Sequence, residues 1–295
     1  MRVFLVDGTF ELFRQFYGAQ RHRSEASMAT AGVAGVLSSV LQLLEQGATH
    51  VGVATDHVIE SFRNGLWAGY KTGAGIDPVL RSQFEPLELA LEALGVKVWA
   101  MVELEADDAL ASACAVCRDE PDCEQVVICT PDKDLAQCVD GGEVVQLDRI
   151  RNVIVDEAAV LAKYGVPPAS IPDWLALVGD SADGFPGLPG WGKKSAAAVI
   201  RRFGTVEAIP DDVAGWDGVG VRSANALAAT LASSRREALL FKRLATLVVD
   251  RSLLGSAEDL RWGGPTTAFS DVAQALGAPA LASRAEAAAA RRGAS

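Results

Sequence analysis

Apolar runs alternate with amphipathic segments through the first half of the chain. Four runs have the length and composition of buried strands, and two shorter strands are expected after them, at 2–6, 50–55, 96–101, 126–129, 144–147 and 152–155. Between them, apolar residues recur at helical spacing, which predicts helices at 9–17, 29–45, 78–94 and 106–116. This alternation predicts an α/β domain with a mainly parallel sheet and flanking helices.

From residue 156 the pattern becomes helical. Helices are expected at 156–163 and 170–178, then up to residue 203, and again at 233–247. Beyond Gly263 the apolar pattern thins into an Ala-rich segment. We therefore expect a catalytic α/β domain at 1–165, a helical domain at 166–260 and a C-terminal tail at 261–295.

Composition narrows the class of protein. The chain is 49% hydrophobic and 22% charged, and no apolar run reaches the length of a membrane span. The apolar stretch at the N-terminus is too short for a signal peptide, and an acidic residue follows it too early. We therefore expect a cytoplasmic protein without a membrane partner. Cys114 and Cys117 have the spacing of a zinc or redox pair, but the odd total of five Cys and their apolar neighbours favour reduced thiols.

Charge is unevenly distributed along the chain. Residues 1–185 carry 13 basic and 28 acidic side chains, whereas residues 186–251 carry 10 basic and 6 acidic ones. The overall charge of −11 argues against nucleic acid, but a basic segment behind an acidic one suits a metal-dependent enzyme that binds phosphates. A mixed protein surface would show the same balance.

Acidic residues follow the predicted strands. Parallel strands bring their carboxyl ends to one edge, which is where such folds place their sites. Mg²⁺ or Mn²⁺ would allow carboxylates to gather there, although each group alone also fits a solvated turn or helix start. The candidate ligands are Asp7, Asp56, Glu105, Asp107, Asp108, Asp132, Asp134, Asp180 and Asp183.

A Gly-rich segment at 62–78 carries Arg63, Tyr70 and Lys71. Its cations suit phosphate, and Tyr70 suits stacking on a base. An ordinary surface loop would have the same composition.

A second Gly-rich stretch ends at the start of a predicted helix. Gly190 and Gly192 bring backbone N–H groups toward a phosphate, and Lys193, Lys194 and Ser195 open the helix behind them. This is the pattern of a helix–hairpin–helix, which holds the DNA backbone without reading sequence.

The pattern recurs 28 residues later, where Gly218, Gly220 and Ser223 repeat Gly190, Gly192 and Ser195, and Arg222 matches Lys194. It indicates either a second, weaker phosphate-binding hairpin or two Ala-rich helices that each follow a Gly turn.

These motifs together resemble the bacterial 5′-nucleases, meaning the 5′→3′ exonuclease domain of DNA polymerase I and the related flap endonucleases. The resemblance runs from about residue 2 to about residue 250. It depends on LVDG (5–8), FRNGLWAGYK (62–71), EADD (105–108), TPDKDL (130–135) and GDSADGFPGLPGWGKKSA (179–196). It implies a PIN-like α/β domain followed by a helix–three-turn–helix segment, in a free-standing monomeric nuclease.

The resemblance also implies roles for single residues. Asp7, Asp56, Glu105 and Asp107 match the ligands of a first metal ion, and Asp108, Asp132, Asp134, Asp180 and Asp183 those around a second. Arg14, Tyr70 and Lys71 match residues that position the scissile phosphate and the terminal bases. The hairpin at 190–194 matches the duplex-binding element, where the family often holds K⁺.

Two positions depart from the family pattern. An Arg is common near Ala74, and an Asn where Gly184 stands. The implied function is two-metal hydrolysis of DNA flaps or 5′ ends in primer removal and repair, with Lys71 and Arg14 stabilising the charged phosphate. A PIN-type ribonuclease and a non-catalytic module for branched DNA are the alternatives.

Overall fold

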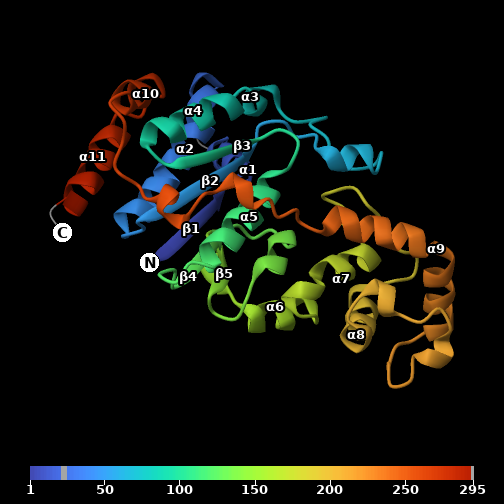
Figure 1. Ribbon diagram of the computed structural model, residues 1–295. Helices are drawn as coiled ribbons and strands as arrows, with labels where there is room; N and C mark the ends of the chain where they lie inside the picture. The colour runs from blue at the N-terminus through green and yellow to red at the C-terminus, as the bar shows by residue number, and fades with distance from the viewer. Residues whose placement is uncertain (21–24, 294–295) are drawn as a thin grey trace. The chain divides into compact units, whose positions relative to one another are not determined.

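The computed structural model describes residues 1–20 and 25–293 of the chain (Figure 1). Two compact units make up the protein. We call them the sheet unit, residues 1–59, 73–130 and 248–295, and the hairpin unit, residues 60–72 and 131–247. These boundaries differ from the sequential domains expected from the sequence, because 60–72 belongs to the hairpin unit and the C-terminal segment to the sheet unit.

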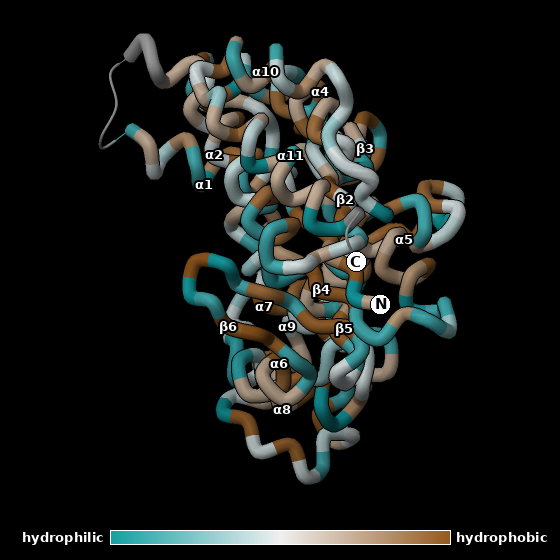
Figure 2. The backbone as a smooth tube through the Cα atoms, turned by 90° about the vertical axis from the view of Figure 1, so that its left-hand side faces the viewer, coloured by the Kyte–Doolittle hydropathy of each residue, from teal (hydrophilic) through white to brown (hydrophobic). Residues whose placement is uncertain are grey.

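Four parallel strands form the centre of the sheet unit. They are β1 (Arg2–Asp7), β2 (His50–Asp56), β3 (Lys97–Met101) and β4 (Gln125–Cys129), in the spatial order β3-β2-β1-β4. Leu5 lies opposite Gly52 on one side and Ile128 on the other. The central strands are buried and mostly apolar along their length, as β4 shows in Figure 2, whereas the edge strand β3 exposes Lys97 and Ala100. The predicted parallel sheet with flanking helices is confirmed.

Helices cover this sheet. They are α1 (Gly8–Ala19), α2 (Glu25–Glu45), α3 (Pro78–Arg81), α4 (Phe84–Leu94), α5 (Ala106–Arg118), α10 (Phe269–Ala275) and α11 (Ala280–Gly293). Helix α5 packs on β1 and β2, and α1 packs on α2. The helix expected at 78–94 is divided by the buried Gln83, whose amide bonds the backbone of Gly32 and Met28.

One described helix segment, Met28–Glu45 in α2, is long and apolar enough to cross a membrane by composition alone. Within the sheet unit 67% of that stretch is buried. Its apolar character is therefore that of a core helix.

The C-terminal segment is packed rather than frayed. Helix α11 lies along α2, and α10 contacts α4. Leu281, Ala285 and Ala288 are buried, and Arg284 binds Glu45 at 2.9 Å. Alanines at helical spacing are only weakly apolar, which is why the sequence predicted a C-terminal tail here.

The hairpin unit is mostly helical. An antiparallel pair, β5 (Val144–Asp148) and β6 (Val153–Val155), precedes α6 (Glu157–Tyr164), α7 (Ile171–Val178), α8 (Lys193–Phe203) and α9 (Ala224–Ala245). Trp174, Phe185, Ile200 and Phe241 belong to its core. The helix expected at 233–247 is the second part of α9, which continues through non-helical Ser234.

Short 3₁₀ segments complete the described chain. They are η1 (Phe62–Gly65), η2 (Asp134–Cys138), η3 (Pro168–Ser170), η4 (Val206–Ala208), η5 (Val213–Gly215), η6 (Arg251–Leu253) and η7 (Ala257–Leu260).

Candidate functional site

Three buried carboxylates lie at the carboxyl edge of the parallel sheet. Asp7 ends β1, where one oxygen accepts the Phe10 N–H at 2.8 Å and the other accepts the Thr130 hydroxyl at 3.0 Å. Asp56 ends β2 and accepts the Ala106 N–H at 2.8 Å, so the start of α5 is fixed to this edge. Glu105 immediately precedes α5. The parallel register therefore brings Asp7 and Asp56 to one edge of the sheet, and their role as metal ligands stays a prediction.

Asp107 and Asp108 share the first turn of α5 but differ in their surroundings. Asp107 is partly exposed. Asp108 has no exposed surface, and its two oxygens accept the backbone N–H groups of Glu105 at 3.0 Å and Val248 at 2.8 Å. These bonds make Asp108 a cap that ties α5 to the C-terminal segment, and its role as a metal ligand stays a prediction.

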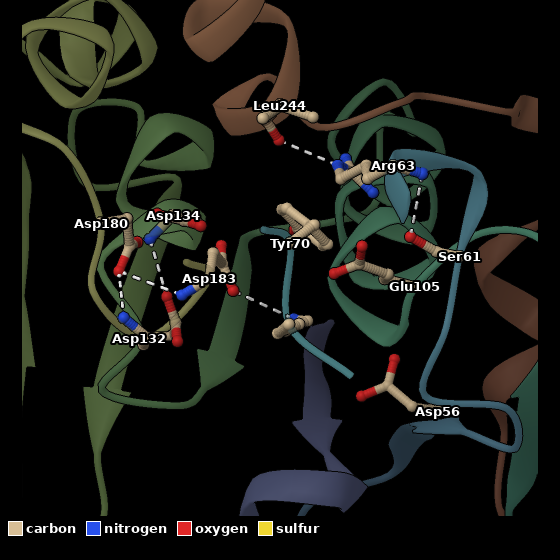
Figure 3. Close-up of polar contacts among 12 residues, drawn as sticks. Asp56, Ser61, Arg63, Tyr70, Glu105, Asp132, Asp134, Asp180, Asp183 and Leu244 are labelled. Carbon is tan, nitrogen blue, oxygen red and sulfur yellow. Dashed lines mark hydrogen bonds and ion pairs between the residues drawn. The ribbon is translucent and has the colours of Figure 1, made fainter. Parts of the chain in front are cut away.

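The hairpin unit holds a second group of acids. Asp134, Asp180 and Asp183 are buried, and one carboxylate oxygen from each lies within 4.8 Å of the others (Figure 3). We call these three residues the acidic cluster. Asp132 is partly exposed beside it and accepts the Asp134 N–H at 2.9 Å.

The acidic cluster has the chemistry of a divalent-cation site. Burial, together with the charges of Asp132 and Asp183, raises the pKa of Asp134 well above its usual range. Its Oδ1 atom is buried and has no hydrogen-bond partner among the described residues. A buried oxygen of this kind is costly unless a cation or proton satisfies it, and hard oxygen ligands suit Mg²⁺ or Mn²⁺.

The turn after α7 positions two members of the acidic cluster. Asp180 accepts the Ala182 N–H at 2.9 Å, and its backbone pairs with Phe185. Gly184 has φ 82°, and a Cβ there would collide with the carbonyl oxygen of Gly69. The departure from the family pattern at Gly184 thus has a local reason, because a side chain would separate the turn from the 60–72 segment.

Two lysines contact the acidic cluster. Lys71 Nζ lies 3.3 Å from Asp183 Oδ1, and its backbone N–H bonds the Asp183 carbonyl at 3.0 Å. Lys133 Nζ lies 2.5 Å from Asp180 Oδ2. Lys71 was among the residues predicted from the sequence. Lys133 was not, although its position between Asp132 and Asp134 indicated that it would lie beside these carboxylates.

Two residues of the 60–72 segment are structural. Arg63 is 1% exposed, and its guanidinium donates to the Leu244 carbonyl at 2.9 Å (Figure 3). It also donates to the Thr246 carbonyl at 3.1 Å. It therefore caps the carboxyl end of α9. Tyr70 is 3% exposed and belongs to the hairpin-unit core. Both side chains are buried in the hairpin unit, and their expected roles toward DNA stay predictions.

Arg14 lies on α1 in the sheet unit. Its guanidinium forms an ion pair with the buried Glu11 and lies 3.4 Å from the Ser39 hydroxyl. The side chain is 29% exposed, so one end of it meets solvent.

The Gly-Lys hairpin is formed as the sequence predicts. Gly190 has φ 80°, α8 begins at Lys193, and Ser195 caps the turn by exchanging hydrogen bonds with Gly192 at 3.0 and 2.9 Å. Lys193 and Lys194 are exposed, and neither forms an ion pair among the described residues.

The second copy of the repeat lies beside the first. Both copies line one open cavity of about 800 Å³. Gly190, Gly192, Lys193, Lys194 and Ser195 contribute from the first copy, and Gly220, Val221, Arg222 and Ser223 from the second. The two Gly-rich turns therefore share one open, basic recess.

A parallel sheet with acids at its carboxyl edge, a buried acidic cluster and a basic Gly hairpin together define a metal-dependent nuclease. Residues 2–165 match the family model described as the 5′-3′ exonuclease N-terminal resolvase-like domain, and residues 166–268 match the 5′-3′ exonuclease C-terminal SAM fold. The chain belongs to the 5′-3′ exonuclease family, as the sequence motifs predicted.

Proteins of similar sequence agree with this family assignment. DNA polymerase I of Pseudomonas aeruginosa is 34% identical over 273 residues, which cover 88% of this chain and 29% of that protein. A 5′-3′ exonuclease of Buchnera aphidicola subsp. Baizongia pistaciae is 28% identical over 265 residues, which cover 89% of this chain and 87% of that one. The chain thus spans less than a third of the polymerase but most of the exonuclease.

Solved structures show the same fold. The zinc-bound T5 5′-exonuclease superimposes with a TM-score of 0.65 and 17% identity over 98% of both chains. The catalytic core of Rad2 in complex with DNA substrate gives 0.61 and 15% over 93% of this chain and 87% of that one.

Proposed function

We propose that the protein is a structure-specific 5′-nuclease that cuts DNA flaps and 5′ ends, acting as a cytoplasmic monomer in primer removal and repair. The observation that carries the proposal is the acidic cluster, with its buried and unpartnered Asp134 oxygen. A non-catalytic module has no need of such a costly arrangement.

Two divalent ions, Mg²⁺ or Mn²⁺, are the proposed cofactors. When bound, such ions would lower the pKa of a water molecule and offset the negative charge that develops on the leaving 3′-oxygen. The sheet unit offers one set of ligands and the hairpin unit the other: Asp7, Asp56, Glu105 and Asp107 in the first, and Asp132, Asp134, Asp180 and Asp183 in the second.

Lys71 and Arg14 are the proposed phosphate-binding cations. The Lys71 backbone is fixed to Asp183, so its ammonium group is held at the cluster that would bind the reacting phosphate. The Arg14 side chain is partly exposed, and its guanidinium contacts Glu11 and Ser39. Both cations would stabilise negative charge that develops on the phosphate.

The recess between the two Gly turns is the proposed grip on duplex DNA. Backbone N–H groups at the start of α8, with Lys193 and Lys194, suit one phosphate, and K⁺ at this hairpin would assist it. Arg222 extends the same recess, which supports the second hairpin as part of the grip. Lys194→Glu and Arg222→Glu should then both weaken duplex binding, and an unchanged affinity in Arg222→Glu would restrict the grip to the first hairpin.

Cleavage of a labelled 5′-flap duplex with Mg²⁺ tests the proposed function. Asp134→Asn should abolish cleavage, whereas the matched control Asp271→Asn, which removes an exposed carboxylate from α10, should leave the rate unchanged. A parallel single-stranded RNA substrate distinguishes a PIN-type ribonuclease. Flap binding without cleavage in the presence of either metal would instead indicate a DNA-binding module.

A further inference from the structure

Lys133 lies within the group of acids that would bind metal. It follows Asp132 and precedes Asp134 in sequence, and its ammonium group is 2.5 Å from Asp180 Oδ2. The Asp180 side chain is only 2% exposed, so this ion pair is shielded from solvent on the acid's side. Lys71 holds Asp183 in a similar way at 3.3 Å. Two of the three carboxylates in the acidic cluster therefore already face a lysine.

An ammonium group and a divalent ion compete for such a carboxylate. Each is attracted by the same oxygen, and the two cations repel each other across a few ångströms of protein. Lys133 has a flexible four-carbon stem and is 29% exposed, which leaves it a path toward solvent. The backbone beside it is held by the Asp134 N–H, which bonds the Asp132 carboxylate at 2.9 Å.

We propose that Lys133 is a tethered cation that stabilises the acidic cluster without metal and lowers its affinity for the divalent ion. This inference rests on the proposed metal-binding role of the cluster. It makes Lys133 a positioning residue for Asp180, rather than a residue that contacts DNA, and it explains how three buried carboxylates are tolerated when no ion is bound. Metal binding then consists of an exchange of one cation for another at Asp180.

Binding of Mn²⁺ to the DNA-free protein, followed by the electron paramagnetic resonance signal of the unbound ion, tests this exchange. The Asp134→Asn variant identifies which bound ion belongs to the acidic cluster. Lys133→Met should bind that ion roughly tenfold more tightly, since a neighbouring positive charge has been removed. Lys133→Arg keeps the charge and should stay within about twofold of the wild type. Lys163→Met, an exposed lysine that lies over the Tyr164 ring, is the neutral control.

Unchanged or weaker affinity in Lys133→Met would overturn the inference while leaving the metal site intact. Absence of any Asp134-dependent Mn²⁺ in both the wild type and Lys133→Met would overturn the metal assignment itself, and this inference with it. The two failures are therefore distinguishable.

Thermal unfolding gives a second readout that does not depend on activity. Without metal, Lys133→Met leaves Asp180 unpaired and should melt at a lower temperature than the wild type. Added Mg²⁺ should raise the melting temperature of this variant by more than it raises that of the wild type, because the ion binds more tightly to the native state. An equal gain in the two proteins would contradict the proposed competition.

Discussion

Replacing Arg63 by methionine separates a structural role from a DNA-binding one. The guanidinium of Arg63 is buried, and it donates to the carbonyls of Leu244 and Thr246 at the end of α9. Methionine preserves much of the packing of the stem but leaves both carbonyls without that donor. We expect the hairpin unit to lose stability while the DNA-binding surface stays unchanged.

The size of the effect follows from those two hydrogen bonds. A hydrogen bond that involves a charged group contributes about 1.5–3 kcal/mol, so the pair would give about 3–6 kcal/mol. The variant no longer has to bury a guanidinium, which offsets part of this loss. We therefore expect a net decrease of about 3 kcal/mol in the free energy of unfolding.

Urea denaturation monitored by tryptophan fluorescence measures this change. With a slope of about 3 kcal/mol per molar urea, the expected loss lowers the midpoint by about 1 M. Arg81→Met is the matched control, because Arg81 is exposed and forms no ion pair among the described residues. Affinity for a flap duplex is measured on the same samples by fluorescence anisotropy. A midpoint that moves by less than about 0.2 M, together with a clear loss of DNA affinity, would refute the capping role.

Three further predictions concern the site and the stability of the protein. Lys71→Met should lower the flap cleavage rate by about 10²–10³-fold with duplex binding retained, because the charge acts on the reacting phosphate. Single-turnover kinetics separate the cleavage rate from DNA binding. A loss of DNA affinity as large as the loss of rate would instead place Lys71 in the DNA grip. Gly184→Ala should destabilise the protein by at least about 2 kcal/mol, because φ there is 82° and the Gly69 carbonyl oxygen occupies the position of the added Cβ. Gly142→Ala is the control, because a Cβ at Gly142 would contact no neighbouring atom among the described residues. Burial lowers the pKa of His50, so its neutral form is favoured in the folded protein. Stability should be full above the unfolded pKa of about 6.5 and fall as the pH drops from there toward the folded value; His50→Gln should flatten this dependence in urea titrations.

The sequence was sufficient for the parts of the fold and site that follow from periodicity. Strands that alternate with helices dictate a parallel sheet, and a parallel sheet fixes which strand ends share an edge. Asp7 and Asp56 could therefore be assigned to one edge without coordinates. The Gly-Lys hairpin was equally readable, because its glycines and lysines are consecutive in the chain.

The direction in which a side chain points could not be predicted from the sequence in this way. Arg63 and Asp108 carry charges that the sequence alone assigns to a ligand or to solvent, but both satisfy backbone groups that are remote in sequence, at Leu244 and Val248. Hydrogen bonds to such backbone groups form only when folding brings segments that are distant in sequence next to each other. The packed α11 was missed for a related reason, since its alanines become an apolar stripe only against α2.

The 60–72 segment shows why a motif does not assign one role to all of its residues. Arg63 and Tyr70 point into the hairpin unit and fix the segment there, and the next residue, Lys71, is thereby held at Asp183 by both its backbone and its ammonium group. The buried residues of the motif thus hold the partly exposed Lys71 in place.

Loosening the segment through Tyr70→Ala should therefore lower cleavage by a route different from that of Lys71→Met. Tyr70→Ala should reduce stability and activity together, and the activity should recover in part at lower temperature. Lys71→Met should stay inactive at every temperature at which it is folded. A temperature series of single-turnover rates, with circular dichroism on the same samples, distinguishes the two, and a Tyr70→Ala protein that is fully folded but inactive would show that Tyr70 has a direct role in the reaction.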